Sequence, residues 1–364
     1  MLGVGKFKKT TPILLGILSA LMFAELILRF GDIFKPPIHI TEQSSLFGFD
    51  HIPNSQGVYS SKEFTVNIKI NSQGLRDEEI NLLKQEGVTR IAVVGDSFIE
   101  GLQVPLEVTS TKILQRMLID ANEKVQVINF GVSGFGLDQK YLYIKNRVLK
   151  YHPDIVVLFL ASNDLDDIKK NNVVFEEKGQ LKFRLFPIDS KLVRLTKGIL
   201  RNLYLANLFF VAMQNNKVNL PNSQLPIEYY LLRGNIPLED VNYMNIAKKL
   251  ILLSEEETVS EHSHIILVIG ADRLQVDKAK IRILEEKYLK SELNTEFFNS
   301  ELVSFASENN IEFLDLLPIF KEESLKGNTL YFNYDGHWNE TGHRVVAQAL
   351  VNPILEILER AKIN

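Results

Sequence analysis

The sequence predicts an α/β fold built on a parallel sheet. Apolar runs at 90–95, 125–129 and 154–160 are continuous and rich in β-branched residues, as strands buried on both faces are. Apolar residues at helical spacing follow the first two runs, at Thr109–Asn122 and Leu137–Tyr151. Strands that alternate with helices in this way favour a parallel sheet with right-handed crossovers.

Two further strands are expected at 263–270 and 311–315. About 100 residues separate the third strand from the fourth, which is too many for a simple crossover. We therefore expect a helical insertion at about 165–250. Its most apolar stretch, Leu203–Val211, is expected to form the core of a helical cap, or else a lid or membrane-facing surface.

The N-terminal end predicts a membrane segment. Three lysines within residues 1–10 precede a mainly apolar segment at 11–30 that is long enough to cross a bilayer. Glu25 and Arg29 interrupt this segment as i,i+4 partners. We expect a cytoplasmic basic tail at 1–10, an uncleaved transmembrane signal anchor at 11–30 and an exported remainder. A cleaved signal peptide and a buried amphipathic helix are the alternatives.

Residues 31–87 are expected to form a stalk with an N-terminal β extension. The stretch 31–62 is polar, is interrupted by proline and glycine, and has little periodicity. Apolar and polar residues then alternate from Phe64 to Ile70, which predicts a strand with one buried face. A short helix is expected over 77–85.

A Gly-Asp-Ser-Phe motif, whose serine is Ser97, follows the first predicted strand. The glycine allows a sharp turn, and open α/β folds place their sites at the carboxyl edge of the sheet. A nucleophilic serine needs an imidazole within hydrogen-bond reach, and the imidazole needs an acid to orient it. Asp335 and His337, in a downstream Asp-Gly-His-Trp motif, can supply that pair.

Two further motifs follow the second and third strands. They are the glycine-rich turn Gly131-Val-Ser-Gly134 and the pair Asn163-Asp164. With these blocks in order, the chain resembles the SGNH hydrolases, also called the GDSL esterase/lipase family, over about 88–165 and 262–352. The positions that match the family's four blocks are Ser97, Gly134, Asn163 and His337.

The resemblance implies a fold and a mechanism. The fold is the flavodoxin-like, three-layer SGNH hydrolase fold at 88–364, with five parallel strands in the order 2-1-3-4-5 and the helical insertion. Ser97 is expected to attack an ester carbonyl, while His337 transfers the proton and Asp335 orients the imidazole.

The resemblance also implies an oxyanion hole. Its donors are the backbone N–H groups of Ser97 and Gly134 and the side-chain amide of Asn163. Gly134 suits this role because a residue without Cβ lets its N–H approach a ligand closely.

Two features depart from the family's pattern. Ala161-Ser162 precedes Asn163 where the family has a glycine, which puts the orientation of the Asn163 amide in question. The acid Asp335 lies two residues before His337 rather than three. The Asp-x-His-Trp motif is similar instead to that of the alginate-type O-acetyltransferases, which are SGNH-like.

Simpler interpretations of the same motifs stay open. The Asp-Ser pair can cap the following helix, and the Asn-Asp pair can form an ordinary turn. Ser133 is a rival nucleophile, although it lacks the Gly-x-Ser-x-Gly spacing. Asp335, His337 and His343 are metal ligands by type. We expect neither a metal nor a cofactor, because the chain has no cysteine and His337 has a better role in catalysis.

Composition narrows the function classes. Of the 364 residues, 45% are hydrophobic and 24% are charged, which is the usual composition of a globular protein. The net charge of −4 argues against a nucleic-acid partner. We expect an extracytoplasmic, membrane-anchored serine esterase that hydrolyses carboxylic esters, with acylated cell-surface carbohydrate as the first substrate class. The alternatives are a polysaccharide O-acetyltransferase and a noncatalytic carbohydrate-binding or assembly protein.

Overall fold

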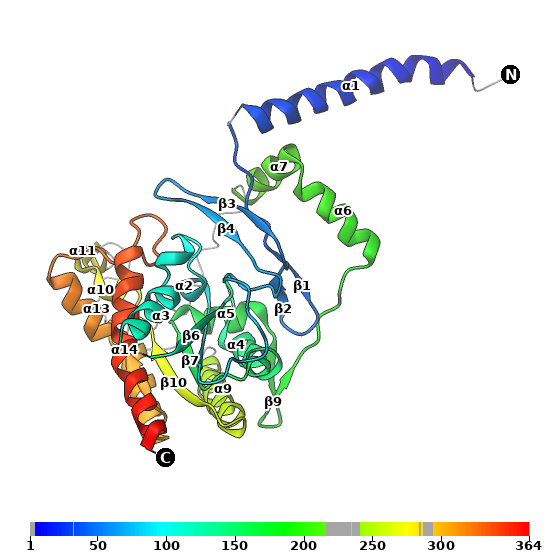
Figure 1. Cartoon of the computed structure of the whole chain (residues 1–364). Helices are drawn as coiled ribbons and strands as arrows, with labels where there is room; N and C mark the ends of the chain where they lie inside the picture. The colour runs from blue at the N-terminus through cyan, green and yellow to red at the C-terminus, as the bar shows by residue number, and fades with distance from the viewer. Residues whose placement is uncertain are drawn as a thin grey trace. The chain divides into compact units, whose positions relative to one another are not determined.

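A computed structural model describes residues 4–31, 33–121, 123–215, 234, 241–283, 285–286 and 294–363 of the chain. The chain divides into two compact units, and Figure 1 labels many of their elements. The helical unit comprises residues 1–39 and 188–224, and the sheet unit comprises residues 40–187 and 225–364.

The sheet unit is built on one five-stranded parallel sheet. Its strands are β5 (Thr89–Gly95), β6 (Val125–Gly131), β7 (Ile155–Leu160), β10 (His264–Ile269) and β11 (Phe313–Asp315). They lie in the order β11-β10-β7-β5-β6, which is 2-1-3-4-5 when these strands are counted along the chain. The predicted α/β architecture and strand order are therefore confirmed.

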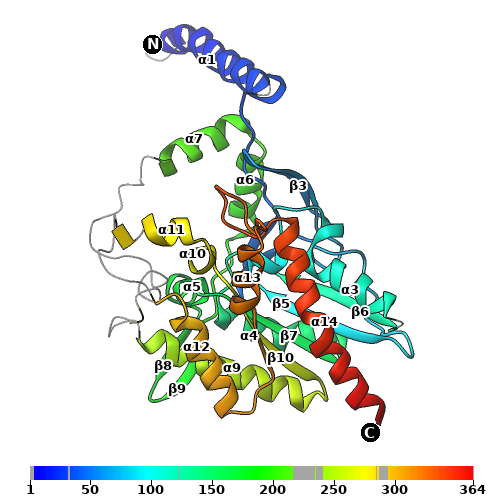
Figure 2. The same cartoon turned by 90° about the vertical axis from the view of Figure 1, so that its left-hand side faces the viewer.

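Helices cover both faces of this sheet. Every residue of β7 is buried, because its side chains on both faces pack against helices. One apolar core lies against α4 (Leu137–Asn146), α5 (Asn163–Asn171), α9 (Val241–Ser260) and α12 (Phe297–Glu308). The other lies against α3 (Ser110–Asp120), α13 (Leu316–Leu325) and α14 (Glu340–Ile363), which Figure 2 shows in front of the strands.

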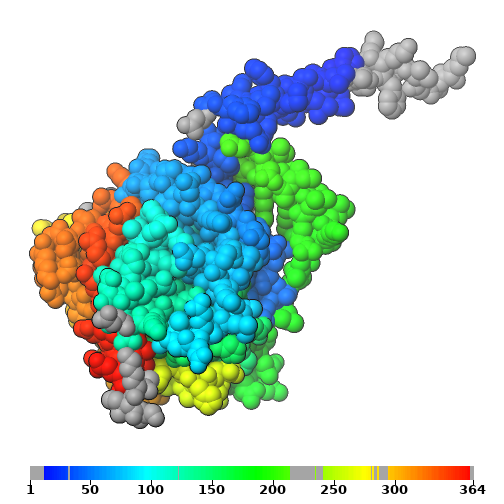
Figure 3. All heavy atoms as spheres, viewed as in Figure 1, coloured from blue at the N-terminus to red at the C-terminus, as the bar shows by residue number. Residues whose placement is uncertain are grey.

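The N-terminal part of the sheet unit is more ordered than the expected stalk. Residues 40–70 form two antiparallel hairpins, β1 (Thr41–Ser44) with β2 (Gly48–His51) and β3 (Gln56–Ser60) with β4 (Thr65–Lys69). Phe47 is buried at the tip of the first hairpin and packs edge-on against Tyr143 of α4. In the space-filling view, this segment and α3 form one continuous surface (Figure 3).

The short helix expected over 77–85 is not formed. These residues are bends and irregular backbone. The reason is that Asp77 is buried and is bonded elsewhere: its carboxylate forms an ion pair with Lys112 and accepts the backbone N–H of Asn129 at 2.8 Å. A buried carboxylate bound to two other elements fixes the chain more strongly than helix propensity does.

The expected insertion at 165–250 contributes to both units. Its first part, α5 and the hairpin β8 (Val174–Glu177) with β9 (Gln180–Phe183), packs into the sheet unit, as does α9. Its middle part, α6 (Lys191–Arg201) and α7 (Tyr204–Asn215), belongs to the helical unit. The described part of the sheet unit also contains the short helices α2 (Ser97–Glu100), η1 (Leu106–Val108), η2 (Val148–Tyr151), α10 (Arg273–Val276) and α11 (Lys278–Ile283).

The helical unit begins with α1 (Val4–Phe30), which continues through the predicted basic tail and the predicted anchor. Within it, Pro12–Phe30 has a mean hydropathy of 2.1 over its most apolar window, and none of that window is buried. This segment of 19 residues is long and apolar enough to cross a membrane, a property that signal sequences share.

A buried histidine links the last helix to the core of the sheet unit. His343 of α14 is 1% exposed, and its Nδ1 accepts the backbone N–H of Ser110 at 3.2 Å. Burial, followed by the positive charge of Arg76, lowers the pKa of His343 to about 3. The side chain is therefore neutral in the folded chain, and it packs edge-on against Trp338.

We predict that acid destabilises the sheet unit through His343. A histidine in the unfolded chain has a pKa of about 6.5, whereas the pKa of folded His343 is about 3. Between these values the unfolded state binds one more proton, so the free energy of unfolding falls by about 1.4 kcal/mol for each pH unit of acidification. Urea denaturation at several pH values measures this slope.

The matched variants are His343→Gln, which keeps a hydrogen-bond acceptor, and His264→Gln at the exposed start of β10. We expect the first to lose this part of the slope and the second to keep it. A slope that is unchanged in His343→Gln would contradict the neutral state of the buried ring.

Candidate active site

The predicted nucleophile lies where β5 meets a short helix, α2 (Ser97–Glu100). Asp96 is the N-cap, and its Oδ1 accepts the backbone N–H of Phe98 at 2.9 Å. The capping expected of the Asp-Ser pair is thus performed by Asp96. A Cβ on Gly131 would lie 2.2 Å from the backbone nitrogen of Glu100, so the glycine lets α2 pack directly against β6.

Ser97, His337 and Asp335 form one hydrogen-bonded chain. The Nε2 of His337 lies 2.7 Å from the Oγ of Ser97, and its Nδ1 lies 2.6 Å from the Oδ1 of Asp335. A carboxylate only accepts hydrogen bonds, so Nδ1 carries the proton and Nε2 accepts the hydroxyl of Ser97. This is the geometry that a general base needs in order to take a proton from a serine.

The carboxyl of Asp335 is ionised in this arrangement. Burial raises its pKa, but the hydrogen bonds from the side chain and backbone of His337 outweigh burial, so its net pKa lies below the usual range. An ionised acid beside Nδ1 stabilises the imidazolium that forms when His337 takes a proton.

The loop that carries this pair is held by a glutamate from the N-terminal hairpins. Glu63 lies in the turn between β3 and β4, and its carboxylate accepts three consecutive backbone N–H groups. The donors are Asn333 at 2.6 Å, Tyr334 at 2.8 Å and Asp335 at 3.0 Å. Sequence reasoning missed this residue, because nothing in a polar turn signals a partner so far along the chain.

The expected oxyanion donors are only partly brought together. The N–H of Ser97 starts α2 and therefore has no acceptor within that helix. Ser97 and Asn163 line one cavity of about 520 Å³, together with Asp335 and His337. Gly134 has a φ of 80° and is not among the described residues that line this cavity, so its role stays a prediction.

The Asn163 amide is fixed by a neighbour on its own helix. Its Nδ2 donates to Asp167 Oδ2 at 3.0 Å, and its buried Oδ1 has no hydrogen-bond partner within the described part of the chain. The unusual Ser162 donates its hydroxyl to the carboxylate of Asp272, just after β10. This hydrogen bond from Ser162, the residue that departs from the family's pattern, links the ends of two neighbouring strands, β7 and β10.

A buried lysine lies beneath the site. Lys140 of α4 is completely buried, and its Nζ lies 3.2 Å from Asp96, 2.7 Å from Asp164 and 3.0 Å from the carbonyl oxygen of Phe159. Burial and the nearby Asp96 raise the pKa of Asp164, to about 8, against the attraction of the lysine. The ammonium thus joins the residues next to Ser97 and Asn163.

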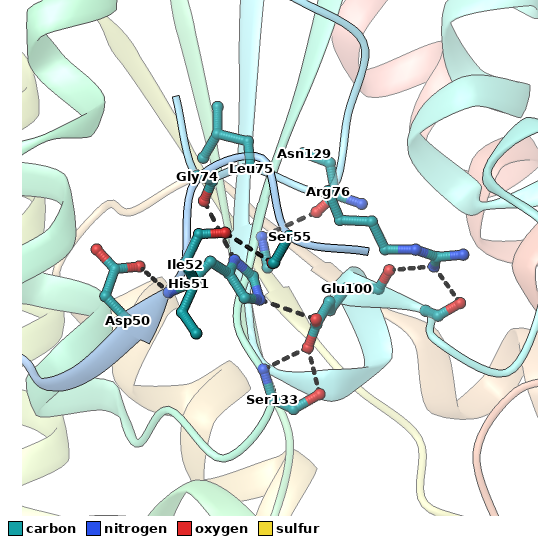
Figure 4. A network of polar contacts seen from close by, with 12 residues as sticks. Asp50, His51, Ile52, Ser55, Gly74, Leu75, Arg76, Glu100, Asn129 and Ser133 are labelled. Atoms are coloured by element: carbon teal, nitrogen blue, oxygen red, sulfur yellow. Dashed lines mark hydrogen bonds and ion pairs between the residues drawn. The ribbon is translucent and has the colours of Figure 1, made fainter. Parts of the chain in front are cut away.

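A second buried network connects α2 to the turn that contains Gly134 (Figure 4). Glu100 accepts the backbone N–H of Ser133 at 2.7 Å and also its hydroxyl, and its other oxygen lies 2.9 Å from Nε2 of His51. Burial favours the neutral forms, but the mutual attraction raises the pKa of His51 and lowers that of Glu100. The hydroxyl of Ser133, the rival nucleophile, is therefore directed toward Glu100.

Comparisons with known proteins give similarities of fold. No protein-family model matches the chain, and no curated protein matches it. Among solved structures, it is similar to the acetyl xylan esterase AlAXEase, with 15% identity over 73% of this chain and 99% of that chain and a TM-score of 0.44. It is also similar to the esterase EstA from Pseudoalteromonas sp., with 12% identity, coverage of 74% and 99%, and a TM-score of 0.41.

A third similar structure is a catalytic mutant of Axe2, an acetylxylan esterase from Geobacillus stearothermophilus. The identity is 14%, the coverage is 72% of this chain and 93% of that one, and the TM-score is 0.43. None of these similarities identifies a substrate for this chain.

We predict that the buried lysine is essential for stability. Lys140→Met leaves Asp96 and Asp164 buried without their cation, so the free energy of unfolding should fall by about 3–5 kcal/mol at a pH above 8. Lys145→Met is the control on the same helix, because its ion pair with Glu257 is partly exposed and should contribute less than about 1 kcal/mol. Equal effects of the two substitutions in urea denaturation would contradict this account.

Proposed function

We propose that the chain is a serine esterase with Ser97 as its nucleophile. The observation that carries this proposal is the hydrogen-bonded chain from Ser97 through His337 to Asp335 at the carboxyl edge of the sheet. The open cavity beside Ser97 supports it, because a substrate carbonyl needs space next to the hydroxyl.

The reaction has two stages. Ser97 Oγ bonds to the ester carbonyl carbon while its proton passes to Nε2 of His337. The tetrahedral intermediate collapses, and the alkoxide leaves with that proton as an alcohol. Water, deprotonated by the same nitrogen, then attacks the acyl group on Ser97, and collapse releases the acid and restores the serine. Asp335 keeps the imidazole in the required tautomer throughout.

The proposed oxyanion donors are the N–H groups of Ser97 and Gly134 and the amide of Asn163. Asn163 has two amide hydrogens, so its bond to Asp167 orients the group and leaves one hydrogen to donate. In acyl-transfer enzymes each such donor contributes about 3–4 kcal/mol to stabilising the transition state.

The cavity lining supports a polar substrate. Asp167, Asp272 and Arg273 line it with polar groups, beside the apolar side chains of Phe98 and Leu274. Tyr334 also lines the cavity, and as much as 84% of its surface is exposed, which suits contact with the apolar face of a sugar ring. We therefore propose an acyl ester on carbohydrate as the substrate class.

We also propose that Pro12–Phe30 anchors the protein, with the N-terminus in the cytoplasm and the sheet unit outside. The length and hydropathy of this segment support the anchor. The lysines that precede it support the orientation. An enzyme held in this way would act on carbohydrate of the cell envelope.

Acyl transfer to a sugar hydroxyl is the second candidate. The Asp-Gly-His-Trp motif favours it, and it needs the same acyl-Ser97 intermediate, which a sugar hydroxyl resolves in place of water. Reactions with and without an acceptor glycan distinguish the two: hydrolysis releases free acid in both, whereas transfer gives an acylated glycan and little free acid. A noncatalytic protein would have no need of an ordered Ser97–His337–Asp335 chain.

We predict that Ser97→Ala and Asp335→Asn abolish ester turnover without unfolding the chain. Loss of the nucleophile should lower kcat by about 10⁴-fold or more, and the wrong imidazole tautomer in Asp335→Asn by about 10⁴-fold. Hydrolysis of short-chain acyl esters by the purified full chain is the measurement. Ser300→Ala, on the surface of α12, is the control that keeps full activity. Near-normal turnover in either active-site variant would overturn the assignment.

A further inference from the structure

The helical unit presents an apolar surface for which the esterase has no need. On α6, Leu192, Leu195 and Ile199 follow one another at helical spacing and are exposed by 71%, 61% and 55%. No residue of α6 is buried. Apolar residues that line one side of a helix normally pack against the protein core, a partner protein or a membrane.

The other side of α6 is basic. Its cations are Lys191, Arg194, Lys197 and Arg201, and Lys191–Arg201 contains no acidic residue. Lys197 forms an ion pair with Asp189, just before the helix. A helix with one exposed apolar side and one basic side is the type that lies in the interface of a membrane.

The next helix, α7, also has exposed apolar side chains. Phe209, Phe210 and Met213 are exposed by 63%, 52% and 45%. The rings of Phe209 and Phe210 contact each other edge-on, with centroids 6.4 Å apart. Aromatic side chains of this kind are favoured at the boundary between headgroups and acyl chains.

Within the helical unit, Glu25 near the end of α1 is bonded directly to the start of α7. The carboxylate of Glu25 accepts the backbone N–H groups of Tyr204 at 3.0 Å and Leu205 at 2.9 Å, which have no acceptor inside their own helix. Arg29 pairs with Glu25 and donates to the carbonyl oxygen of Asn202 at 2.8 Å. These bonds account for two charged residues inside an apolar segment.

The same bonds fix the depth of α7 relative to α1. Glu25 and Arg29 lie in the last two turns of Pro12–Phe30, the segment that is long enough to cross a bilayer. Where that segment ends, the acyl region of a bilayer gives way to headgroups. The junction of α6 and α7 is therefore at this boundary whenever α1 spans a membrane.

We propose that α6 and α7 lie in the interface of the membrane that α1 crosses. Their apolar sides enter the acyl region, and the basic side of α6 contacts anionic lipid headgroups. This proposal rests on the membrane anchor proposed above and is independent of the esterase activity. It assigns the exposed side chains of the apolar stretch Leu203–Val211, Phe209 and Phe210 above all, to contact with lipid.

Fluorescent labels test this directly, because the chain has no cysteine of its own. Single-cysteine variants of the full chain, labelled with an environment-sensitive fluorophore, are reconstituted into vesicles of phosphatidylcholine with phosphatidylglycerol. Leu195→Cys and Phe209→Cys report the proposed surface, and Arg194→Cys reports the basic side of α6. Leu18→Cys reports the anchor, and Ser300→Cys is the solvent control.

We expect blue-shifted emission and quenching by brominated lipid at positions 195 and 209, solvent-like emission at 300, and weaker quenching at 194 than at 195. Quenching at 18 with solvent-like emission at 195 and 209 would overturn the proposal while leaving the anchor intact. A blue shift at 195 and 209 that brominated lipid does not quench would also overturn it, since protein would then cover the surface. Absence of quenching at 18 would remove the anchor and this proposal together, whatever the esterase assay gives.

Discussion

The buried ammonium of Lys140 is the interaction on which the candidate site depends. The ammonium lies between Asp96, at the end of β5, and Asp164, just after β7. Asp96 directly precedes the predicted nucleophile Ser97, and Asp164 directly follows the predicted oxyanion donor Asn163. Asp96 uses its other oxygen to cap α2, so one side chain both starts the helix and binds the lysine. A completely buried cation that is bonded to both carboxyl groups has few alternative positions, and the two strand ends are therefore held at a fixed separation.

The N-terminal hairpins complete the site from outside the sheet. Glu63 holds the backbone of the loop that carries Asp335, and His51 binds Glu100, which in turn holds the turn of Gly134. Two parts of the proposed machinery, the acid–base loop and the oxyanion turn, thus rest on residues that precede the predicted catalytic domain. In the structure, these residues belong to the same compact unit as the sheet, which comprises residues 40–187 and 225–364.

The central sheet was predictable because burial on both faces requires continuous β-branched runs, and those runs are visible in the sequence. Ser97 lies at the carboxyl edge of the sheet, as expected after a buried strand. Its proximity to His337, in the loop before α14, was predicted from the need of a nucleophilic serine for an imidazole. Glu63, Lys140 and Asp272 were not, because their roles arise from tertiary contacts with distant segments. The sequence contained one weak indication of the role of Lys140: it is a charged residue on the apolar side of the predicted helix Leu137–Tyr151. The strands before residue 62 were also not predicted. Buried and exposed residues do not alternate along them, so they are recognised only from their pairing with one another in the structure.

Covalent labelling with a fluorophosphonate tests the central claim, that Ser97 is the activated nucleophile, most directly. Peptide mass spectrometry of the labelled full chain should locate the adduct on Ser97. Labelling should be lost in His337→Ala, because the hydroxyl then has no base, and should stay on Ser97 in Ser133→Ala. An adduct on Ser133, or no adduct in a preparation that hydrolyses esters, would contradict the account.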